Sequence, residues 1–303
     1  MPPTTAYLAP EGFLEELTAE LGPQVGAIHG RLVVADGPPV DPPPAFVANI
    51  WHDAEEVAIA SIGDAARQLR AVQRNWALYG VEHHRRAALI VEKLPKVSAR
   101  PLVFGDPAPT APLGSFTLIA PDRMLFAARC SSPFPNGEAR FVEDREGPPS
   151  RAYLKLWEAL TLIGERPQPG ETCLDLGAAP GGWTWVLASL GARVIAVDKA
   201  PLDAAVAAMP GVATRSASAF SLDPSREGPV DWLFSDVICY PGRMLALIER
   251  WIAAGAARRI VTTVKFQGPT DLGAIAAFHA IPGGRLMHLH HNKHELTFVW
   301  RGA

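Results

Sequence analysis

The chain has 303 residues, of which 48% are hydrophobic and 19% are charged, and its formal net charge is −3. This length suffices for about two domains, and the apolar fraction supplies packed cores, so a wholly disordered protein is excluded. The near-neutral balance also excludes a polybasic protein whose affinity for nucleic acid comes from bulk charge. It does not exclude nucleic acid as a substrate.

The spacing of the cysteines and the length of the apolar runs indicate the compartment of the protein. Cys130, Cys173 and Cys239 lie far apart and form no CxxC pair, so we expect neither a disulfide framework nor a cysteine-based zinc site. The first residues lack the basic and apolar regions of a secretory signal, and no apolar run reaches the ~18 residues of a membrane span. We therefore expect a cytoplasmic protein with no membrane contact and no obligate protein partner.

Proline is about twice as frequent as usual, with 29 residues, and it clusters at 38–44, 107–112 and 148–149. In so apolar a chain these clusters indicate rigid connections. The last cluster precedes Ser150, which we expect to cap a helix that carries Leu154, Trp157, Leu160 and Leu162. We therefore predict a smaller α+β domain over residues 1–148 and a second domain over residues 149–303.

The first half mixes strands and helices. Apolar periodicity predicts strands at 5–8 and 28–34, helices at 11–21 and 53–79, and a β-hairpin formed by 116–119 and 124–128. The main basic stretch of this half is His83-His84-Arg85-Arg86 with Lys93, Lys96 and Arg100. This stretch is equally consistent with contacts to RNA phosphates and with a solvated helix face.

The second half alternates short apolar strands with helical stretches, which is typical of a parallel sheet covered by helices. No helical stretch separates the last two predicted strands, so we expect them to pair antiparallel at a sheet edge. The prediction is an α/β, Rossmann-like sheet of seven mostly parallel strands. The expected strands are 172–176, 193–197, 212–215, 232–235, 259–264, 286–290 and 297–300.

A loop of small residues follows the first of these strands. Its sequence runs Asp175-Leu-Gly-Ala-Ala-Pro-Gly-Gly-Trp183, and a helix is expected from about Gly182. Glycines let the backbone approach a ligand closely. Ala179 stands where the GxGxxG fingerprint has its second glycine, and no Gly-Lys-Ser/Thr follows, so binding of a pyrophosphate is disfavoured.

Asp198 ends the second strand of this half. A carboxylate at that point can accept hydrogen bonds from both hydroxyls of a ribose. A ligand with a ribose and no pyrophosphate fits S-adenosylmethionine. The alternative is an ordinary strand–turn–helix in which Asp198 only caps the helix and binds no ligand.

With these residues the chain resembles the FtsJ-type ribose 2′-O-methyltransferases, and within them the bacterial large-subunit ribosomal RNA cytidine 2′-O-methyltransferase family (RlmM). The resemblance covers residues 149–303. It implies a methyltransferase fold, S-adenosylmethionine as cofactor and methyl transfer to RNA, most specifically to 23S ribosomal RNA. The first half resembles that family's RNA-binding THUMP-containing region only around residues 7–21 and 119–133, and it is shorter. The stretches that carry the resemblance, besides the glycine loop, are Pro149-Ser-Arg151, Leu154-Lys-Leu156, Val197-Asp198, Asp231-Trp-Leu233, Ser235-Asp236, Thr263-Val-Lys265 and Glu295-Leu-Thr297.

Transfer of a methyl group to a ribose hydroxyl needs alignment of two atoms and a base that removes a proton. Lys265 follows an apolar strand, where burial and a second cation, Lys155, would favour its neutral amine. Asp236 can hold Lys265, and Glu295 can orient Lys155 and the substrate. The resemblance implies that Lys155, Asp236, Lys265 and Glu295 form the catalytic Lys-Asp-Lys-Glu set.

The resemblance also implies the residues that contact the cofactor. Two departures from the family pattern stand out: Ser218 replaces an acidic residue expected near the adenine, and Ala152 replaces a serine near the start of the domain. Both would weaken cofactor binding. The predicted cofactor-binding residues are Gly177, Ala179, Pro180, Gly181, Gly182, Trp183, Asp198, Ser218 and Asp236.

Other features of the sequence suggest four alternatives. His288, His290, His291 and His294 could suggest a metal site, but on a strand His290 and His291 would face opposite sides, so no metal is predicted. A methyltransferase for another acceptor should carry an aromatic or Asn-Pro motif after the fourth strand, where residues 236–239 read Asp-Val-Ile-Cys. A non-catalytic RNA-binding module that keeps the fold, or a 2′-O-methyltransferase of another RNA, remains open.

Overall fold

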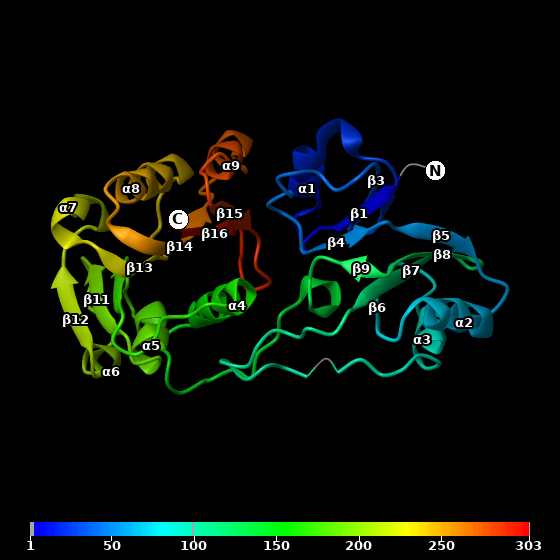
Figure 1. Cartoon of the computed structure of the whole chain (residues 1–303), viewed down its shortest axis with the longest axis horizontal. Coiled ribbons are helices and arrows are strands. Elements are labelled where there is room, and N and C mark those ends of the chain that lie inside the picture. Colours follow the sequence, from blue (N-terminus) through cyan, green and yellow to red (C-terminus); the bar gives the residue numbers. More distant parts are fainter. Residues whose placement is uncertain (1–2, 99, 303) are drawn as a thin grey trace. The chain divides into compact units, whose positions relative to one another are not determined.

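The computed structural model describes residues 3–98 and 100–302. The chain forms two compact units (Figure 1). One is built from Met1–Leu102 and Ala108–Arg140, and the other from Val103–Pro107 and Phe141–Ala303. The second unit thus takes in more than the residues after 149, because Phe104 stacks on Trp157 at a ring-centroid distance of 4.8 Å and Phe141 packs edge-on against the same ring. Among the described residues, no helix combines the length and the apolar character that crossing a membrane requires.

The first unit contains a five-stranded antiparallel sheet with the order β2-β3-β1-β4-β9. One helix packs against it, because Leu17 and Leu21 share a buried cluster with Tyr7 and Val33 of the central strands. The bounds are β1 Thr4–Leu8, α1 Leu14–Leu21, a 3-10 turn Gly22–Gln24, β2 Ile28–His29, β3 Leu32–Asp36, β4 Asn49–His52 and β9 Arg129–Cys130.

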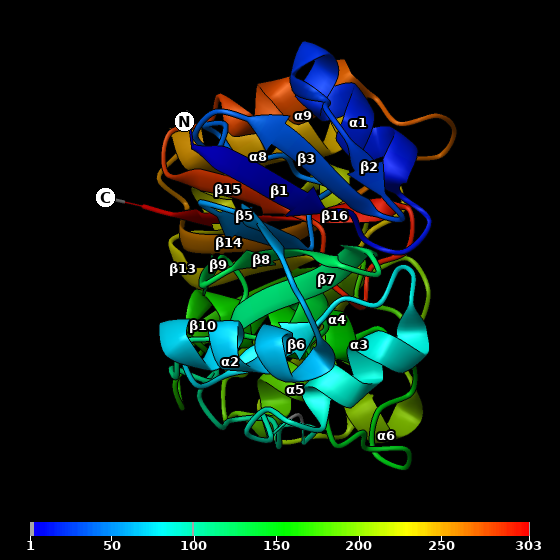
Figure 2. The same cartoon turned by 90° about the vertical axis from the view of Figure 1, so that its right-hand side faces the viewer.

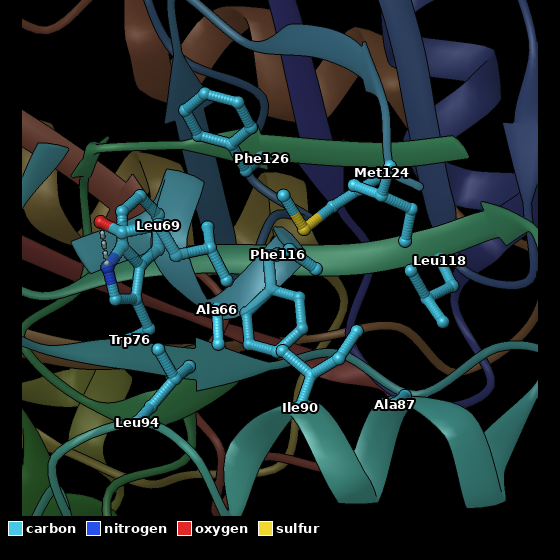
Figure 3. Packing of buried hydrophobic residues seen from close by; sticks show 12 residues of the cluster. Ala66, Leu69, Trp76, Ala87, Ile90, Leu94, Phe116, Leu118, Met124 and Phe126 are labelled. Carbon is cyan, nitrogen blue, oxygen red and sulfur yellow. Dashed lines mark hydrogen bonds between the residues drawn. The ribbon is translucent and has the colours of Figure 1, made fainter. Parts of the chain in front are cut away.

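A four-stranded sheet with the order β5-β8-β7-β6 completes this unit. Its helices α2 and α3 lie next to each other on one side of it (Figure 2). Phe116, Met124 and Ile90 meet in the core between sheet and helices (Figure 3). The bounds are β5 Glu55–Ala58, α2 Ile62–Val72, β6 Trp76–Leu78, α3 His84–Val91, β7 Gly114–Ala120, β8 Arg123–Ala127 and a 3-10 turn Pro135–Gly137.

The structure confirms the first strand and the β7–β8 hairpin, and it corrects two predictions in this unit. The strand expected at 28–34 is two strands, because the chain reverses at Gly30, whose φ of +59° suits glycine. The helix expected over 53–79 is only α2, flanked by β5 and β6. Trp76 continues the helical spacing of Leu69 but belongs to β6, where it pairs with Gly114.

The second unit is built on the predicted seven-stranded, mostly parallel sheet, with the order β12-β11-β10-β13-β14-β16-β15. The first five strands in this order run parallel, as the alternation of strands and helices indicates. The bounds are β10 Thr172–Leu176, β11 Arg193–Asp198, β12 Val212–Ser216, β13 Val230–Ser235, β14 Ala257–Lys265, β15 Gly284–Met287 and β16 Glu295–Arg301.

Helices cover both faces of this sheet, with α8 and α9 on one side and α4 and α5 on the other (Figure 1). A parallel sheet needs such cover because its strands are apolar on both faces. The bounds are α4 Tyr153–Ile163, α5 Gly182–Ser189, α6 Ala204–Ala207, a 3-10 turn Ala219–Ser221, α7 Pro224–Glu227, α8 Pro241–Ala253 and α9 Leu272–His279.

The two antiparallel pairings sit at one end of the sheet. Strand β16 pairs antiparallel with both β14 and β15, so the last strand lies between two earlier ones. The strand predicted at 286–290 ends at Met287, so His290 and His291 lie in the loop before β16 and strand alternation does not place them. The register pairs Lys265 at the end of β14 with Glu295 at the start of β16.

Candidate active site

The loop between β10 and α5 is held so closely that its glycines have no room for a side chain. Gly177 has a φ of +76°, and a Cβ there would lie 2.7 Å from the Cβ of Val237. Gly181 has a φ of +117°, and a Cβ would lie 2.9 Å from Val206. Both positions need glycine for conformation and for space. The loop is therefore pressed against the chain that follows β13, with its backbone facing a cavity.

That cavity has a volume of about 360 Å³ and opens at the carboxyl ends of β10, β11, β13 and β14. Ligand sites of open α/β sheets lie at this edge. Two polar atoms that face this region, Ser150 Oγ and Asp175 Oδ1, are buried and make no hydrogen bond to protein. The lining is formed by Ser150, Ala152, Asp175, Gly177, Ala178, Ala179, Pro180, Gly182, Trp183, Asp198, Asp236, Val237, Ile238 and Lys265.

Ser150 is not the cap of α4 that the sequence predicts. Helix α4 begins at Tyr153 after Ala152, with no side-chain cap. Ser150 instead lies against Gly182, where a Cβ would come within 2.7 Å of Ser150 Oγ. Because Gly182 has no side chain, the Ser150 hydroxyl reaches the first turn of α5 beside the cavity.

Most of the predicted cofactor residues line the cavity. Asp198 accepts hydrogen bonds from Ala179 N at 3.1 Å and from Ala200 N at 2.9 Å, which fixes its carboxylate at the end of β11. The Trp183 indole donates to Ala152 O at 3.0 Å. Gly181 and Ser218 are not part of the lining. Ser218 Oγ accepts a hydrogen bond from Phe220 N in the turn after β12.

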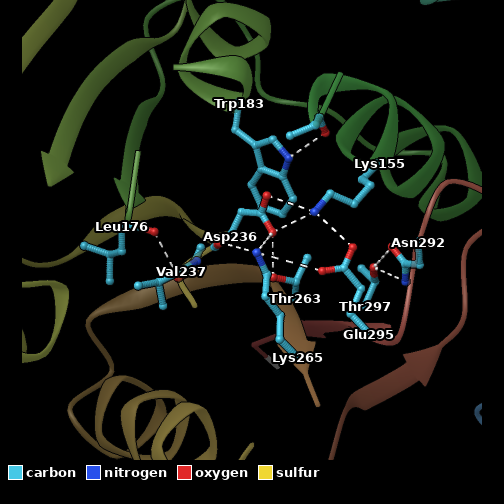
Figure 4. A network of polar contacts seen from close by, with 12 residues as sticks. Lys155, Leu176, Trp183, Asp236, Val237, Thr263, Lys265, Asn292, Glu295 and Thr297 are labelled. Atoms are coloured by element: carbon cyan, nitrogen blue, oxygen red, sulfur yellow. Dashed lines mark hydrogen bonds and ion pairs between the residues drawn. The ribbon is translucent and has the colours of Figure 1, made fainter. Parts of the chain in front are cut away.

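The four predicted catalytic residues converge at the side of the cavity where β13, β14 and β16 meet α4 (Figure 4). Lys155 Nζ donates to both carboxylate oxygens of Asp236, at 2.8 and 2.9 Å, and lies 3.1 Å from Glu295 Oε1. Lys265 Nζ lies 2.9 Å from Asp236 Oδ1 and 3.9 Å from Glu295 Oε2. Two ammonium groups and two carboxylates thus form one closed, electrically balanced set.

Asp236 is the centre of this set. Burial alone would raise the pKa of its carboxyl, but Lys155 and Lys265 outweigh burial and hold the pKa below its ordinary value. Thr263, on β14, donates through Oγ1 to Asp236 Oδ1 at 2.8 Å, and Lys265 Nζ also donates to the Asp236 backbone carbonyl at 2.7 Å. Asp236 is therefore a fixed anion, and Lys265 is held by both its main chain and its side chain.

A second carboxyl, Asp175, lies fully buried behind the glycine loop. Burial raises its pKa to about 7, against the opposing hydrogen bond from Thr184 Oγ1 at 2.6 Å, with Asp236 and Asp198 adding to the rise. A carboxyl with this pKa is partly protonated at neutral pH. Its unpartnered oxygen can therefore donate as well as accept.

The loop before Glu295 is tied to α4 by Glu158, one turn after Lys155. Glu158 is 1% exposed, and its carboxylate accepts hydrogen bonds from His290 N at 2.7 Å, His291 N at 3.0 Å and the ring of His291 at 2.6 Å. One helix thus carries both a member of the charged set and the anchor of the loop that leads to Glu295. Within residues 3–98 and 100–302, no group of three or more His, Cys, Asp or Glu side chains is arranged to hold a metal ion.

Three residues of this site were not found by sequence reasoning. They are Thr263, which donates to Asp236, Glu158, which anchors the loop before Glu295, and Ile238, which lines the cavity. Glu158 carried a signal that could have been used: a carboxylate in the otherwise apolar stretch Tyr153–Ile163 needs buried donors.

Comparisons with known proteins identify a matching family and curated relatives. Residues 148–250 match the sequence model of the FtsJ-like methyltransferase family. Relatives include "Ribosomal RNA large subunit methyltransferase M" of Halorhodospira halophila, 39% identical over 176 residues, and of Aromatoleum aromaticum, 38% identical over 164 residues. These matches cover 55% and 49% of this chain, and 51% and 44% of the relatives, so the chain spans about half the length of the relatives it matches.

Similar solved structures are more distant. TrmN from Thermus thermophilus is 13% identical with a TM-score of 0.36, and the match covers 99% of both chains. A 1,6-didemethyltoxoflavin-N1-methyltransferase from Burkholderia thailandensis, solved with S-adenosylhomocysteine, is 20% identical with a TM-score of 0.36. That match covers 51% of this chain and 80% of the other.

Proposed function

We propose that this protein transfers a methyl group from S-adenosylmethionine to a ribose 2′-hydroxyl of RNA, and that the RNA is 23S ribosomal RNA. The observation that carries the proposal is the closed set of Lys155, Asp236, Lys265 and Glu295 beside the cavity of the glycine loop. The names of the relatives support the choice of ribosomal RNA.

The residues around the cavity fit S-adenosylmethionine. The cavity offers an unpartnered serine hydroxyl and an unpartnered carboxyl oxygen, Ser150 Oγ and Asp175 Oδ1, where a ligand with amino and carboxylate groups needs donors and acceptors. Asp198 would hold the ribose hydroxyls, and the backbone from Ala179 to Gly182 would lie along the methionine part. When bound, the cofactor supplies a methyl group on a cationic sulfur.

In the proposed mechanism the protein positions the hydroxyl and removes its proton. Lys265 accepts the proton as a neutral amine, held between the main-chain carbonyl and the carboxylate of Asp236. Lys155 keeps Asp236 ionised, and Glu295 spans the two lysines and faces the substrate.

The first unit is proposed to select the RNA, as residues 1–148 were predicted to do. Supporting this, Arg85, Lys93, Lys96 and Arg100 are exposed on and after α3, where they can contact phosphates. Because its proposed substrate is ribosomal RNA, we propose that the protein acts in the cytoplasm, where ribosomes are assembled.

The test is a methylation assay on transcribed, unmodified 23S ribosomal RNA with radiolabelled S-adenosylmethionine, followed by mapping of the 2′-O-methyl positions. We expect one specific position in the wild type. Lys265→Ala should keep cofactor affinity, measured by calorimetry, and lose transfer by about 10²-fold or more. A Lys265→Ala protein that still methylates RNA would refute the assigned base.

The alternatives give other outcomes. A 2′-O-methyltransferase of another RNA would leave 23S ribosomal RNA unlabelled and label total RNA. A non-catalytic RNA-binding module would bind RNA and show no measurable heat with S-adenosylmethionine.

A further inference from the structure

The segment between Asp236 and α8 alternates in burial in an unusual way. Ile238 and Tyr240 are 73% and 68% exposed, and Cys239 between them is buried. Tyr240 has an extended backbone, with φ −67° and ψ 147°. Because Cys239 is buried and both of its neighbours are exposed, Ile238 and Tyr240 project to the solvent side of the segment.

These are the two most exposed large apolar side chains among the described residues, and they lie directly after a residue of the catalytic set. Ile238 itself lines the cavity together with Lys265 and Asp236. The apolar pair therefore continues the rim of the cavity outward. A ribose whose hydroxyl lies at Lys265 inside the cavity would have the rest of its nucleotide at this rim.

The pair offers two kinds of surface to one flat ring. Residues two apart on an extended chain are about 6.6 Å apart along the backbone. The aliphatic side chain of Ile238 and the aromatic ring of Tyr240 are therefore near enough along the chain to contact the same nucleobase, and bases stack on aromatic side chains.

Positive charge flanks this slot. Arg243, in the first turn of α8, is exposed, and its guanidinium lies 3.8 Å from the ring centroid of Phe220. Burial raises the pKa of the Cys239 thiol, and the charges of Arg243 and Lys265, both near it, oppose that rise. Cys239 thus lies near Lys265, the proposed catalytic base, and near Arg243, an exposed cation.

We infer that Ile238 and Tyr240 form a slot for the nucleobase of the nucleotide whose ribose is methylated, and that Arg243 contacts a neighbouring phosphate. This inference rests on the proposed function and adds the recognition of an unstacked base to it. Aromatic stacking is tolerant of base identity, so the slot holds the nucleotide in place for Lys265 and leaves the choice of sequence to other contacts.

The test compares Tyr240→Ala and Tyr240→Phe on transcribed 23S ribosomal RNA. We expect Tyr240→Ala to raise the KM for RNA about 5- to 150-fold, the range for loss of one stacked base, and Tyr240→Phe to stay within about twofold of the wild type. Cofactor affinity should be unchanged in both, which also shows that the domain is folded. Leu272→Ala, another exposed apolar residue of the same unit, is the matched control and should have a normal KM.

A second arm identifies the occupant. An RNA with an abasic ribose at the mapped position should be a poorer substrate for the wild type, and Tyr240→Ala should no longer distinguish it from intact RNA. Equal discrimination by the two proteins would overturn the slot. So would a change of oligomeric state in Tyr240→Ala with a normal KM, since the surface would then bind another copy of the chain.

Failure of the proposed function is recognised separately. Binding of a fluorescent single-stranded oligoribonucleotide, followed by anisotropy, does not require transfer. A wild type that transfers no methyl group but loses RNA affinity on Tyr240→Ala would refute the proposed activity and retain the slot. Unchanged RNA affinity in that variant would refute the slot, whether or not the wild type is active.

Discussion

Removal of Lys155 should reveal how strongly the charged set depends on its second cation. Lys155→Met keeps most of the side-chain volume but leaves Asp236 and Glu295 without the ammonium that lies about 3 Å from both. Breaking a buried pair on one side costs about 3–5 kcal/mol. Lys265 remains 2.9 Å from Asp236, so we expect a loss near the lower value, about 3 kcal/mol.

Urea unfolding at pH 7, followed by circular dichroism, measures this loss. The pKa of Asp236 is held below its ordinary value, so its stabilising contribution is present above pH 3.8 and is lost only as the pH falls through the lowered pKa. Measurements at pH 7 therefore contain it in full. Lys199→Met, at an exposed position of the same unit, is the control and should change the free energy of unfolding by less than about 0.5 kcal/mol.

A double-mutant cycle with Glu295→Gln tests the geometry itself. If Lys155 bridges the two carboxylates, removal of the charge of Glu295 should relieve part of the cost of Lys155→Met, with a coupling of about 1–3 kcal/mol. Additivity within about 0.5 kcal/mol would refute the bridge. A Lys155→Met protein as stable as the wild type would refute the reasoning about the whole set.

Three further outcomes are expected. Gly177→Ala places a methyl group 2.7 Å from Val237 Cβ at a φ of +76°, so the dissociation constant for S-adenosylmethionine, measured by calorimetry, should rise about tenfold or more. Glu158→Gln replaces one of the two accepting carboxylate oxygens by an NH2 donor, so amide hydrogen exchange over residues 290–295 should accelerate about fivefold or more. Burial raises the pKa of Asp175 to about 7, so the folded protein keeps a proton that the unfolded chain loses above pH 3.8. Stability should therefore fall by up to about 1.4 kcal/mol per unit as the pH rises from 5 to 7, and Asp175→Asn should lack this decline.

The first two of these have matched control variants. Gly242→Ala, where nothing lies within 4 Å of the new methyl group, should keep cofactor affinity. Glu165→Gln changes a carboxylate whose partners, Arg259 and Arg301, lie elsewhere, and should leave exchange over 290–295 unaltered. Equal affinity in Gly177→Ala, unchanged exchange in Glu158→Gln, or parallel pH curves for Asp175→Asn would each contradict the corresponding argument.

The sequence was sufficient for the sheet of the second unit because its strands are short apolar runs, each separated by a recognisable helix or turn. It was also sufficient to name the four charged residues that the structure brings together, since strand ends share one edge of a parallel sheet. Their roles stay a prediction. In the first unit the predicted helix was wrong at Trp76. This residue follows Leu69 at helical spacing, but it belongs to strand β6, and apolar spacing alone does not distinguish the two.

Long-range partners could not be read from the chain. Glu158 lies 132 and 133 positions from the two amides that it accepts, and no local pattern links them. Ser150 has the local signature of a helix cap, but its position depends on the missing side chain of Gly182, 32 residues away. Local propensity describes what a residue can do, and packing decides which of those options is used.

The position of β16 has a consequence for synthesis of the protein. This strand is made after every other strand of its sheet, yet it fills the space between β14 and β15 and brings in Glu295. A nascent chain that ends before β16 leaves a gap in the sheet, in which the facing edges of β14 and β15 are unpaired. Lys155 and Lys265 then lie beside Asp236 without the carboxylate of Glu295. The charged set therefore closes in the same event that completes the sheet, and a partly synthesised chain has neither.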